Sequence, residues 1–205
     1  MSFYNFAKTI ANFCISAFYK IECTNLQNVP DRSFLMCCNH VSLADPIIAV
    51  MKLKRPFRFM AKAELFRNPL LKLLIQKLGA FPVDRGTGDM TPIYTSIDII
   101  KSGGNLLIFP EGTRSKTGEL LRPRSGAALI ALKTGADILP VSIRFENKKK
   151  FRSKLYISYG KIIKNSDLGL VENNPRTLHS ASKHIMEHIR ILWEGNTIPQ
   201  PENNL

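Results

Sequence analysis

The architecture of this chain follows from one short stretch, Phe34-Leu35-Met36-Cys37-Cys38-Asn39-His40-Val41-Ser42-Leu43-Ala44-Asp45-Pro46. It opens with an uninterrupted apolar run, which is typical of a strand buried on both faces. It closes with an acidic residue before proline, which is typical of a helix start with Asp45 as the N-cap. The polar residues in between therefore lie in a loop at the end of a strand, where functional sites are commonly built.

Similar apolar runs recur along the chain, separated by stretches with helical periodicity. The runs predicted to be buried strands are residues 34–38, 57–61, 79–83, 105–109, 138–145 and 154–159. The predicted helices are residues 65–78, 91–101, 125–134 and 175–193. This alternation favours an α/β fold, with a central mostly parallel or mixed sheet flanked by helices. Pro140, inside one apolar run, suggests an edge strand, a bulge or a wall of an acyl pocket.

The N-terminal residues 2–21 are apolar and aromatic apart from one narrow polar stripe, which predicts an amphipathic helix. The wide apolar face of such a helix packs on the rest of the domain, lies in the headgroup layer of a membrane, or does both. No run reaches the ~20 apolar residues needed to span a bilayer, so membrane contact is expected to be peripheral or monotopic. The polar stripe consists of Asn5, Lys8, Thr9, Asn12, Ser16 and Lys20.

Composition limits the possible partners. The chain has 29 Lys and Arg against 16 Asp and Glu, a formal net charge of +13, which predicts an anionic partner such as lipid headgroups, phosphorylated substrates or nucleic acid. A nucleic-acid-binding module is the alternative from another class, but neither a recognition helix nor an aromatic platform is evident. Four cysteines form no C-x-x-C pair, and no cleavable signal peptide is evident, so a cytoplasmic location is expected.

His40 and Asp45 are the candidates for acid–base chemistry. In a continuous helix, five positions would place their side chains about 140° apart, so they meet only if the chain turns between them. A carboxylate bonded to one imidazole nitrogen fixes the tautomer and raises the basicity of the other nitrogen, as a general base requires. Taken alone, the pair also fits a helix cap beside a loop histidine.

Two further loops follow predicted strands and place an arginine near a glycine. In Glu111-Gly112-Thr113-Arg114 the glycine permits close backbone approach, and the forked guanidinium suits a phosphate group. Arg85 stands beside Gly86 after another strand. Each loop alone fits a charged surface turn with a local ion pair equally well.

Four blocks in this order resemble the lysophosphatidic acid acyltransferases, or 1-acylglycerol-3-phosphate acyltransferases, within the glycerolipid acyltransferases. Residues 39–45 fall on the family's N-H-x-x-x-x-D block, and residues 109–115 match its F-P-E-G-T-R-S block residue for residue. Residues 83–85 and 139–141 are similar to its second and fourth blocks. The resemblance divides the chain into a membrane-association segment, residues 1–30, and a glycerolipid acyltransferase domain, residues 31–205.

The resemblance implies transfer of a fatty acyl group from acyl-CoA or acyl carrier protein to the sn-2 hydroxyl of 1-acylglycerol 3-phosphate, giving phosphatidic acid for phospholipid biosynthesis. In that reaction His40 is the general base and Asp45 orients it. The thioester is a co-substrate, and neither a cofactor nor a metal is implied. The residues implied to bind the acceptor phosphate are Arg85, Glu111, Gly112, Thr113 and Arg114.

Alternatives remain within this chemistry. The acceptor could be glycerol 3-phosphate or another lysolipid, because the catalytic block is shared. Cys37, Cys38 and Ser42 lie near His40 and would allow a covalent acyl-enzyme, although their spacing does not mark a nucleophile. The expected partners are an anionic membrane surface at its cytoplasmic face, a lysophospholipid acceptor and the thioester donor, with no nucleic acid.

Overall fold

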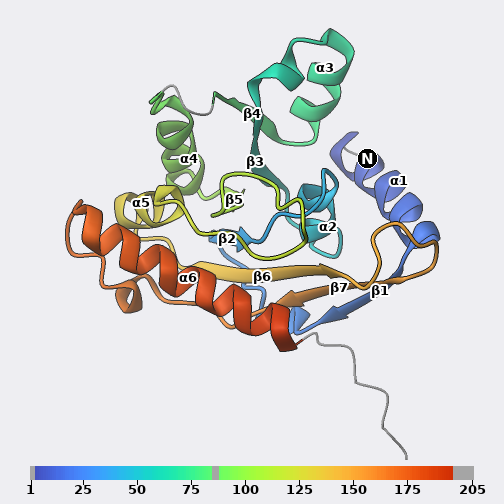
Figure 1. The fold of residues 1–205 in the computed structure, drawn as a ribbon. Helices are drawn as coiled ribbons and strands as arrows, with labels where there is room; N and C mark the ends of the chain where they lie inside the picture. Colours follow the sequence, from blue (N-terminus) through green and yellow to red (C-terminus); the bar gives the residue numbers. More distant parts are fainter. Residues whose placement is uncertain (1–2, 85–87, 196–205) are drawn as a thin grey trace, which may run out of the picture.

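A computed structural model describes residues 3–84 and 88–195 (Figure 1). Within these residues a seven-stranded sheet has the order β1-β7-β6-β2-β5-β3-β4. Neighbouring strands are parallel except β6 and β7, which confirms an α/β fold with a mixed sheet. The strands are β1 (Lys20–Thr24), β2 (Leu35–Cys38), β3 (Phe57–Lys62), β4 (Ala80–Val83), β5 (Asn105–Ile108), β6 (Ile138–Phe145) and β7 (Lys154–Tyr159).

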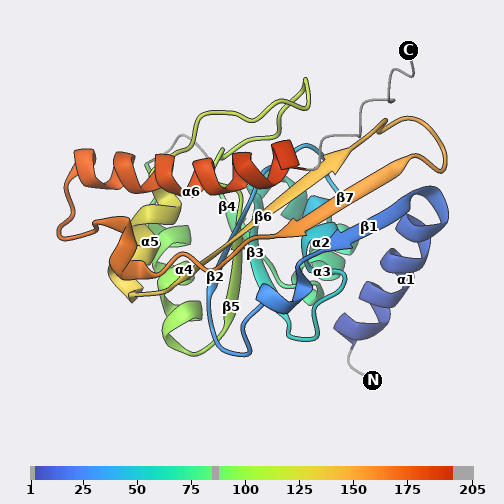
Figure 2. The ribbon, with the colours of Figure 1, turned by 90° about the horizontal axis from the view of Figure 1, so that it is seen from below.

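Helices cover both faces of the sheet (Figure 2). α4, α5 and α6 pack on one face, and α1 and α2 pack on the other. The α-helices are α1 (Phe3–Phe18), α2 (Asp45–Val50), α3 (Pro69–Lys77), α4 (Thr91–Lys101), α5 (Gly126–Thr134) and α6 (Pro175–Gly195). Short 3-10 turns are η1 (Leu26–Asn28), η2 (Ala63–Phe66) and η3 (Asn165–Leu168).

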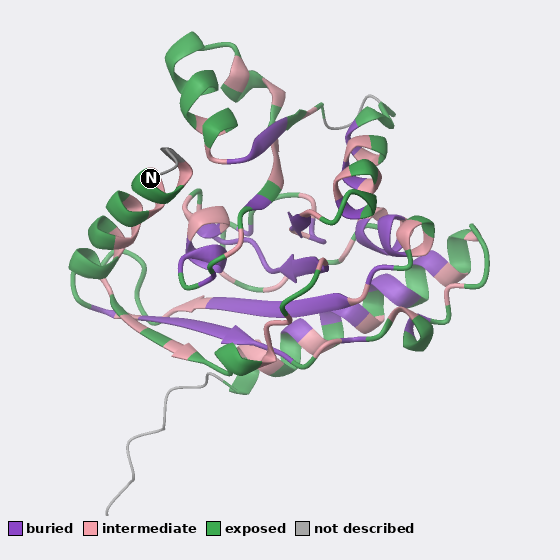
Figure 3. Cartoon of the chain, turned by 180° about the vertical axis from the view of Figure 1, so that it is seen from behind, coloured by how far each residue is buried: buried purple, intermediate pink, exposed green. Residues whose placement is uncertain are grey.

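Strand β2 lies in the middle of the sheet and explains why its sequence is continuously apolar. Successive side chains of a strand point to opposite faces. Leu35 and Cys37 join the core under α5 and α6, whereas Met36 and Cys38 join the core under α1 and α2. All four are buried, and Figure 3 shows that buried residues concentrate in the central strands and the helix faces packed on them. Each such apolar side chain contributes roughly 1.5–3 kcal/mol through burial.

The six predicted strands are present, and the predicted helix 91–101 has the observed bounds. The predicted helix 65–78 is instead divided into η2 and α3. Asn68 caps the second part, because its Oδ1 accepts a hydrogen bond from Leu71 N at 3.0 Å, and Pro69 then occupies the first helical turn. A side-chain cap followed by proline starts a new helix rather than continuing an old one.

The prediction for the N-terminus was partly wrong. The helix expected over residues 2–21 ends at Phe18, and Lys20–Thr24 forms the edge strand β1, paired in parallel with β7. In this strand Ile21 and Cys23 are less exposed than their polar neighbours. This alternation has the period of a half-buried strand. It was overlooked because Lys20 also continues the helical spacing of the polar residues before it.

Pro140 does not mark an edge, because β6 lies between β7 and β2. Its carbonyl oxygen accepts a hydrogen bond from Gly160 N at 2.8 Å, on the β7 side. The N–H and C=O groups of one strand residue point to the same side of the strand. The hydrogen bond that Pro140 cannot donate is therefore lost on the β7 side. Pairing with β2 is therefore not interrupted, and an interior proline is tolerated here.

Candidate active site

The site is built at the carboxyl ends of β2 and β5, which are parallel neighbours. The loop that follows each strand therefore leaves the sheet at the same edge, the usual position of sites in open α/β sheets. Asn39, directly after β2, is fully buried and pairs with the main chain of Ile143 in β6. Its Nδ2 donates to Ile143 O at 2.9 Å, and its Oδ1 accepts from Ile143 N at 2.8 Å. This pair fixes the start of the His40 loop.

His40 and Asp45 meet, because the chain turns between them. Asp45 Oδ2 lies 2.7 Å from His40 Nδ1 and accepts hydrogen bonds from Val41 N and Ser42 N, each at 2.6 Å. Asp45 was expected to cap its own helix, which is wrong: Ala44 is the N-cap and Asp45 is the first helical residue. Its carboxylate instead binds the loop that precedes the helix.

The orientation of His40 leaves one ring nitrogen available. With Nδ1 bonded to the carboxylate, Nε2 makes no hydrogen bond to any residue that the structure describes. The ring stacks on Phe109, with centroids 4.0 Å apart and planes inclined by 18°. His40 is 8% exposed, and Nε2 is the ring nitrogen left available for exchange of a proton.

Glu111 ties the β5 loop to the His40 loop and points inward. Its two carboxylate oxygens accept hydrogen bonds from His40 N at 3.0 Å and from Leu121 N at 3.3 Å. A third bond, from Ser115 N to His40 O at 2.8 Å, joins the same loops. Glu111 is 2% exposed and forms no ion pair with Arg114, and its hydrogen bonds hold the two loops together.

The environment of Glu111 is unusual for a carboxyl group. Burial raises its pKa to about 7, well above the ordinary value of 4.5. The main-chain N–H groups of His40 and Leu121 lower the pKa, and the nearby charge of Asp45 raises it. Burial is the dominant cause because the charged form loses its hydration.

The rest of the Glu-Gly-Thr-Arg turn faces outward. Thr113 and Arg114 are exposed, and in the described part of the chain no carboxylate pairs with Arg114. Gly112 has a φ of +69°, and a Cβ atom here would lie 2.6 Å from the Cδ of Arg124. The turn therefore brings Arg124, a second exposed arginine, against the glycine. Arg85 lies outside the described residues.

Arg124 was not identified from the sequence. It lies in the loop that leads to α5, held there by a hydrogen bond of 2.8 Å from its N–H to Pro110 O. Only its positive charge distinguished it in the sequence, and that charge was one of 29. Its position beside Gly112 depends on how the loop folds back over the turn.

A mainly apolar cavity of about 220 Å³ begins next to His40. Phe109 contributes to its wall and also stacks on the imidazole ring, so the cavity is separated from the catalytic candidate by one side chain. Its mainly apolar lining suits an alkyl chain. The other apolar side chains of the wall include Met60, Val83, Ile93, Leu107 and Ile130.

The nearby thiols lack the environment of a nucleophile. Cys37 and Cys38 are fully buried, and burial raises the pKa of both thiols well above the ordinary value, which disfavours the reactive thiolate. Ser42 Oγ accepts a weak hydrogen bond from Ala44 N at 3.3 Å. Among the residues that the structure describes, no three His, Cys, Asp or Glu side chains are grouped as a metal site requires.

Comparison with known proteins identifies related sequences. The family model described as Acyltransferase matches residues 20–144. The chain is 32% identical over 161 residues to the 1-acyl-sn-glycerol-3-phosphate acyltransferase of Bacillus subtilis, covering 75% of this chain and 80% of that protein. It is also 32% identical over 141 residues to a chloroplast protein of the same name from Arabidopsis thaliana, covering 67% of this chain.

Coverage and structural similarity complete the comparison. The chain spans 39% of the length of the Arabidopsis thaliana relative and 51% of the length of the Borreliella burgdorferi relative, less than two thirds in each case. The crystal structure of the 1-acyl-sn-glycerophosphate acyltransferase PlsC from Thermotoga maritima superposes with a TM-score of 0.75. That match covers 96% of this chain and 81% of the other at 24% sequence identity, and it shows a shared fold.

Replacing Glu111 with glutamine is expected to cost more stability at about pH 5 than at about pH 8. The folded protein binds this proton more tightly than the unfolded chain, so wild-type stability falls as the pH rises from 4.5 toward 7. Glutamine does not titrate. The difference in unfolding free energy between wild type and Glu111→Gln should therefore narrow by up to about 3 kcal/mol across this range.

Urea unfolding of both proteins at several pH values measures this difference. The exposed Glu119 in the same loop provides the matched control, Glu119→Gln. A difference that stays constant or widens with pH would contradict the raised pKa of Glu111.

Proposed function

Because this chain belongs to the Acyltransferase family, we propose that it transfers a fatty acyl group from a thioester to the sn-2 hydroxyl of 1-acylglycerol 3-phosphate, producing phosphatidic acid. One observation carries the proposal: Asp45 holds His40 Nδ1 at 2.7 Å and leaves Nε2 free beside the Glu-Gly-Thr-Arg turn. The reaction requires a proton acceptor, a phosphate-binding group and a place for an acyl chain. The oriented imidazole, the exposed arginine and the apolar cavity match these three requirements in that order.

The proton of the acceptor hydroxyl moves to His40 Nε2 as the oxygen attacks the thioester carbonyl. The ionised carboxylate of Asp45 stabilises the imidazolium that forms. The new C–O ester bond then replaces the C–S bond, and the departing sulfur takes the proton back from Nε2. Direct transfer is favoured over an acyl-enzyme because the neighbouring thiols, Cys37 and Cys38, are buried and have raised pKa values.

Recognition of the acceptor is assigned to the outward side of the turn. Arg114 offers a forked guanidinium, which binds phosphate oxygens in pairs, and Thr113 adds a hydroxyl. Arg124 lies against Gly112 and places a second guanidinium at the same turn. Arg85 remains a proposed contact outside the described residues. The fatty acyl chain of the donor is assigned to the apolar cavity beside Phe109.

The surface of α1 supports contact with a membrane. Two residues of its polar stripe face the protein: Lys8 Nζ donates to Leu53 O, and Asn12 Nδ2 donates to Met51 O at 3.0 Å. Ile15 packs on the core, whereas Phe6, Ile10, Phe13 and Phe18 are exposed, with Phe13 75% exposed. An outward apolar face on a helix anchored through its polar residues suits the headgroup layer of a bilayer.

A second apolar surface lies on α3, which Figure 1 shows on the same side of the molecule as α1, away from α6. Leu70 is 80% exposed, and Leu73 and Leu74 are also exposed. Leu43, between the two catalytic candidates, is exposed too. Within residues 3–84 and 88–195, every helix falls short of the length or apolarity that crossing a bilayer requires.

The net charge of +13 complements anionic lipid, which is abundant in the cytoplasmic leaflet. The apolar face of α1, the exposed leucines of α3 and the positive field together support binding to that leaflet, where the lysophospholipid acceptor resides. We therefore place the chain at the cytoplasmic face of the membrane, bound to one leaflet.

Assays with a panel of acceptors test the proposed reaction. Purified protein with acyl-CoA is expected to acylate 1-acylglycerol 3-phosphate faster than glycerol 3-phosphate or an unphosphorylated monoacylglycerol. Arg114→Ala should raise the KM for 1-acylglycerol 3-phosphate by about tenfold or more with little change in kcat, because a charge-assisted contact to the ground-state phosphate is lost.

Arg122→Ala is the matched control, since Arg122 is an exposed arginine of the neighbouring loop that lines neither cavity. Faster acylation of glycerol 3-phosphate would show that the acceptor is a different one. Absence of acyl transfer to every hydroxyl in the panel would reject the proposed function itself.

Replacing Phe6 and Phe13 with serine should weaken binding to vesicles that contain phosphatidylglycerol by at least about tenfold, because each exposed phenylalanine loses ~1.5–3 kcal/mol of apolar burial. Vesicle flotation measures the bound fraction. Val171→Ser with Ile191→Ser removes two exposed apolar side chains elsewhere and should leave binding unchanged. Equal losses in both double variants would contradict a specific role for α1.

A further inference from the structure

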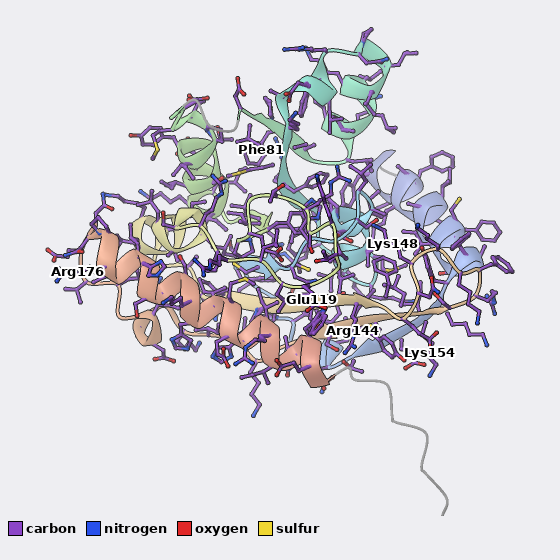
Figure 4. The ribbon with its side chains drawn as sticks, in the orientation of Figure 1. Phe81, Glu119, Arg144, Lys148, Lys154 and Arg176 are labelled. Atoms are coloured by element: carbon purple, nitrogen blue, oxygen red, sulfur yellow. The ribbon has the colours of Figure 1, made fainter. Side chains whose placement is uncertain are left out.

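A second cavity, of about 670 Å³, adjoins the His40 loop and has no role in the reaction described above. Four segments that are distant in sequence form its wall: Tyr19 after α1, residues 115–119, residues 143–145 with 147–149, and Trp193 near the end of α6. Val41, the residue after His40, also lines it. Figure 4 labels Glu119, Arg144 and Lys148, which belong to this wall.

The wall of this cavity is strongly cationic. It contains one carboxylate, Glu119, against four positively charged side chains. Two of these, Lys116 and Lys149, are exposed and form no ion pair within residues 3–84 and 88–195. Walls of a single charge sign concentrate the electric field inside a cleft and attract anions. The four cations are Lys116, Arg144, Lys148 and Lys149.

Aromatic groups hold two of the cations in place. The guanidinium carbon of Arg144 lies 4.5 Å from the centre of the Trp193 ring, and Arg144 Nη1 donates to Trp193 O at 3.2 Å. Tyr19 Oη donates to Lys148 O at 2.5 Å, and Lys148 Nζ donates to Val41 O at 2.7 Å. The wall is thus an organised structure, and Lys148 connects it directly to the catalytic loop.

The two cavities lie at opposite ends of the loop that follows β5. Phe109 and Gly112 line the apolar cavity, whereas Ser115 lines the cationic one. Two of these residues contact His40: Phe109 stacks on its ring, and Ser115 N donates a hydrogen bond to His40 O. His40 therefore lies between the two cavities. An acyl-CoA has its parts in the same order: an alkyl chain, the reacting carbonyl, and a carrier that ends in phosphates.

We propose that the cationic cavity binds the phosphorylated nucleotide end of an acyl-CoA donor, an assignment that rests on the proposed acyl transfer. Its volume falls within the range of ~300–1,000 Å³ typical of sites for whole small molecules and is larger than a single phosphate requires. The cations come from two separate segments, Lys116 from the loop after β5 and the other three from the end of β6 and the turn after it, which suits a ligand with several phosphates. Tyr19, Phe145 and Trp193 add aromatic surface for a base.

An acidic carrier protein fits this cavity less well. A folded protein would contact the cations at the rim and leave the concave interior unfilled, whereas a nucleotide enters it. The acceptor phosphate is assigned elsewhere, to the outward side of the turn with Arg114. The geometry therefore separates donor from acceptor, with His40 between them.

Trp193 makes the proposal directly testable, because it is the single tryptophan of the chain. Titration with CoA should change its fluorescence with saturation, whereas pantetheine, which lacks the nucleotide, should bind at least about tenfold more weakly. Lys116→Glu with Lys149→Glu should weaken CoA binding by about tenfold or more. These two lysines are chosen because they contact neither the catalytic loop nor Trp193 in any hydrogen bond of the described chain.

The matched control reverses two charges elsewhere on the surface, with Arg176→Glu and Lys183→Glu. Both residues lie on α6 outside the cavity, and Figure 4 shows Arg176 at the end of that helix opposite Arg144. Net charge falls equally in the two double variants, so CoA binding should persist in the control. In turnover, the lysine variant should raise the KM for acyl-CoA and leave the KM for an acyl-pantetheine unchanged.

The results separate this proposal from the proposed function. An unchanged fluorescence on addition of CoA, or wild-type affinity for CoA in the lysine variant, would overturn the nucleotide site. Efficient use of an acyl carrier protein by a chain that does not bind CoA would overturn it as well. Saturable CoA binding that depends on Lys116 and Lys149, without acyl transfer from any donor, would support the site and reject the transferase activity.

Discussion

The site depends on one buried carboxylate oxygen. Asp45 Oδ2 accepts three hydrogen bonds, from His40 Nδ1, Val41 N and Ser42 N, and these donors offset part of the cost of burying the charge. Its other oxygen, Oδ1, is buried and has no hydrogen-bond partner among the described residues. Oδ2 holds the turn of the loop before α2 and fixes the imidazole. A shorter or uncharged side chain at Asp45 would therefore disturb chemistry and loop geometry together, which makes this carboxylate both a structural and a functional element.

The sheet brings the remaining parts to that carboxylate. β2 and β5 are parallel neighbours although His40 and Glu111 are separated by 71 positions in sequence. Once the strands pair, their following loops meet at one edge and are joined by bonds from His40 N to Glu111 and from Ser115 N to His40 O. The apolar cavity is lined by Phe109, which stacks on His40, and the cationic cavity is lined by Val41, the residue after His40.

Much of this arrangement was predictable, because fully buried strands leave continuous apolar runs and the His40 and Glu111 blocks are unmistakable in sequence. β1 was missed, since a short edge strand gives only a weak alternating signal beside a long helical stripe. The inward direction of Glu111 and the contact of Arg124 with Gly112 depend on loop folding, which side-chain patterns do not encode. The cationic cavity was likewise invisible, because Lys116, Arg144 and Trp193 converge only in the fold.

The most direct measurement of the central claim is the rate of acyl transfer to 1-acylglycerol 3-phosphate by His40→Ala, alongside its binding to anionic vesicles. Removing the base should lower the rate by roughly 10²–10⁴-fold or abolish it. Vesicle binding should remain at the wild-type level, because His40 is 8% exposed and lies outside the apolar surface of α1. Transfer at a rate near that of the wild type would contradict the role of His40 as the general base.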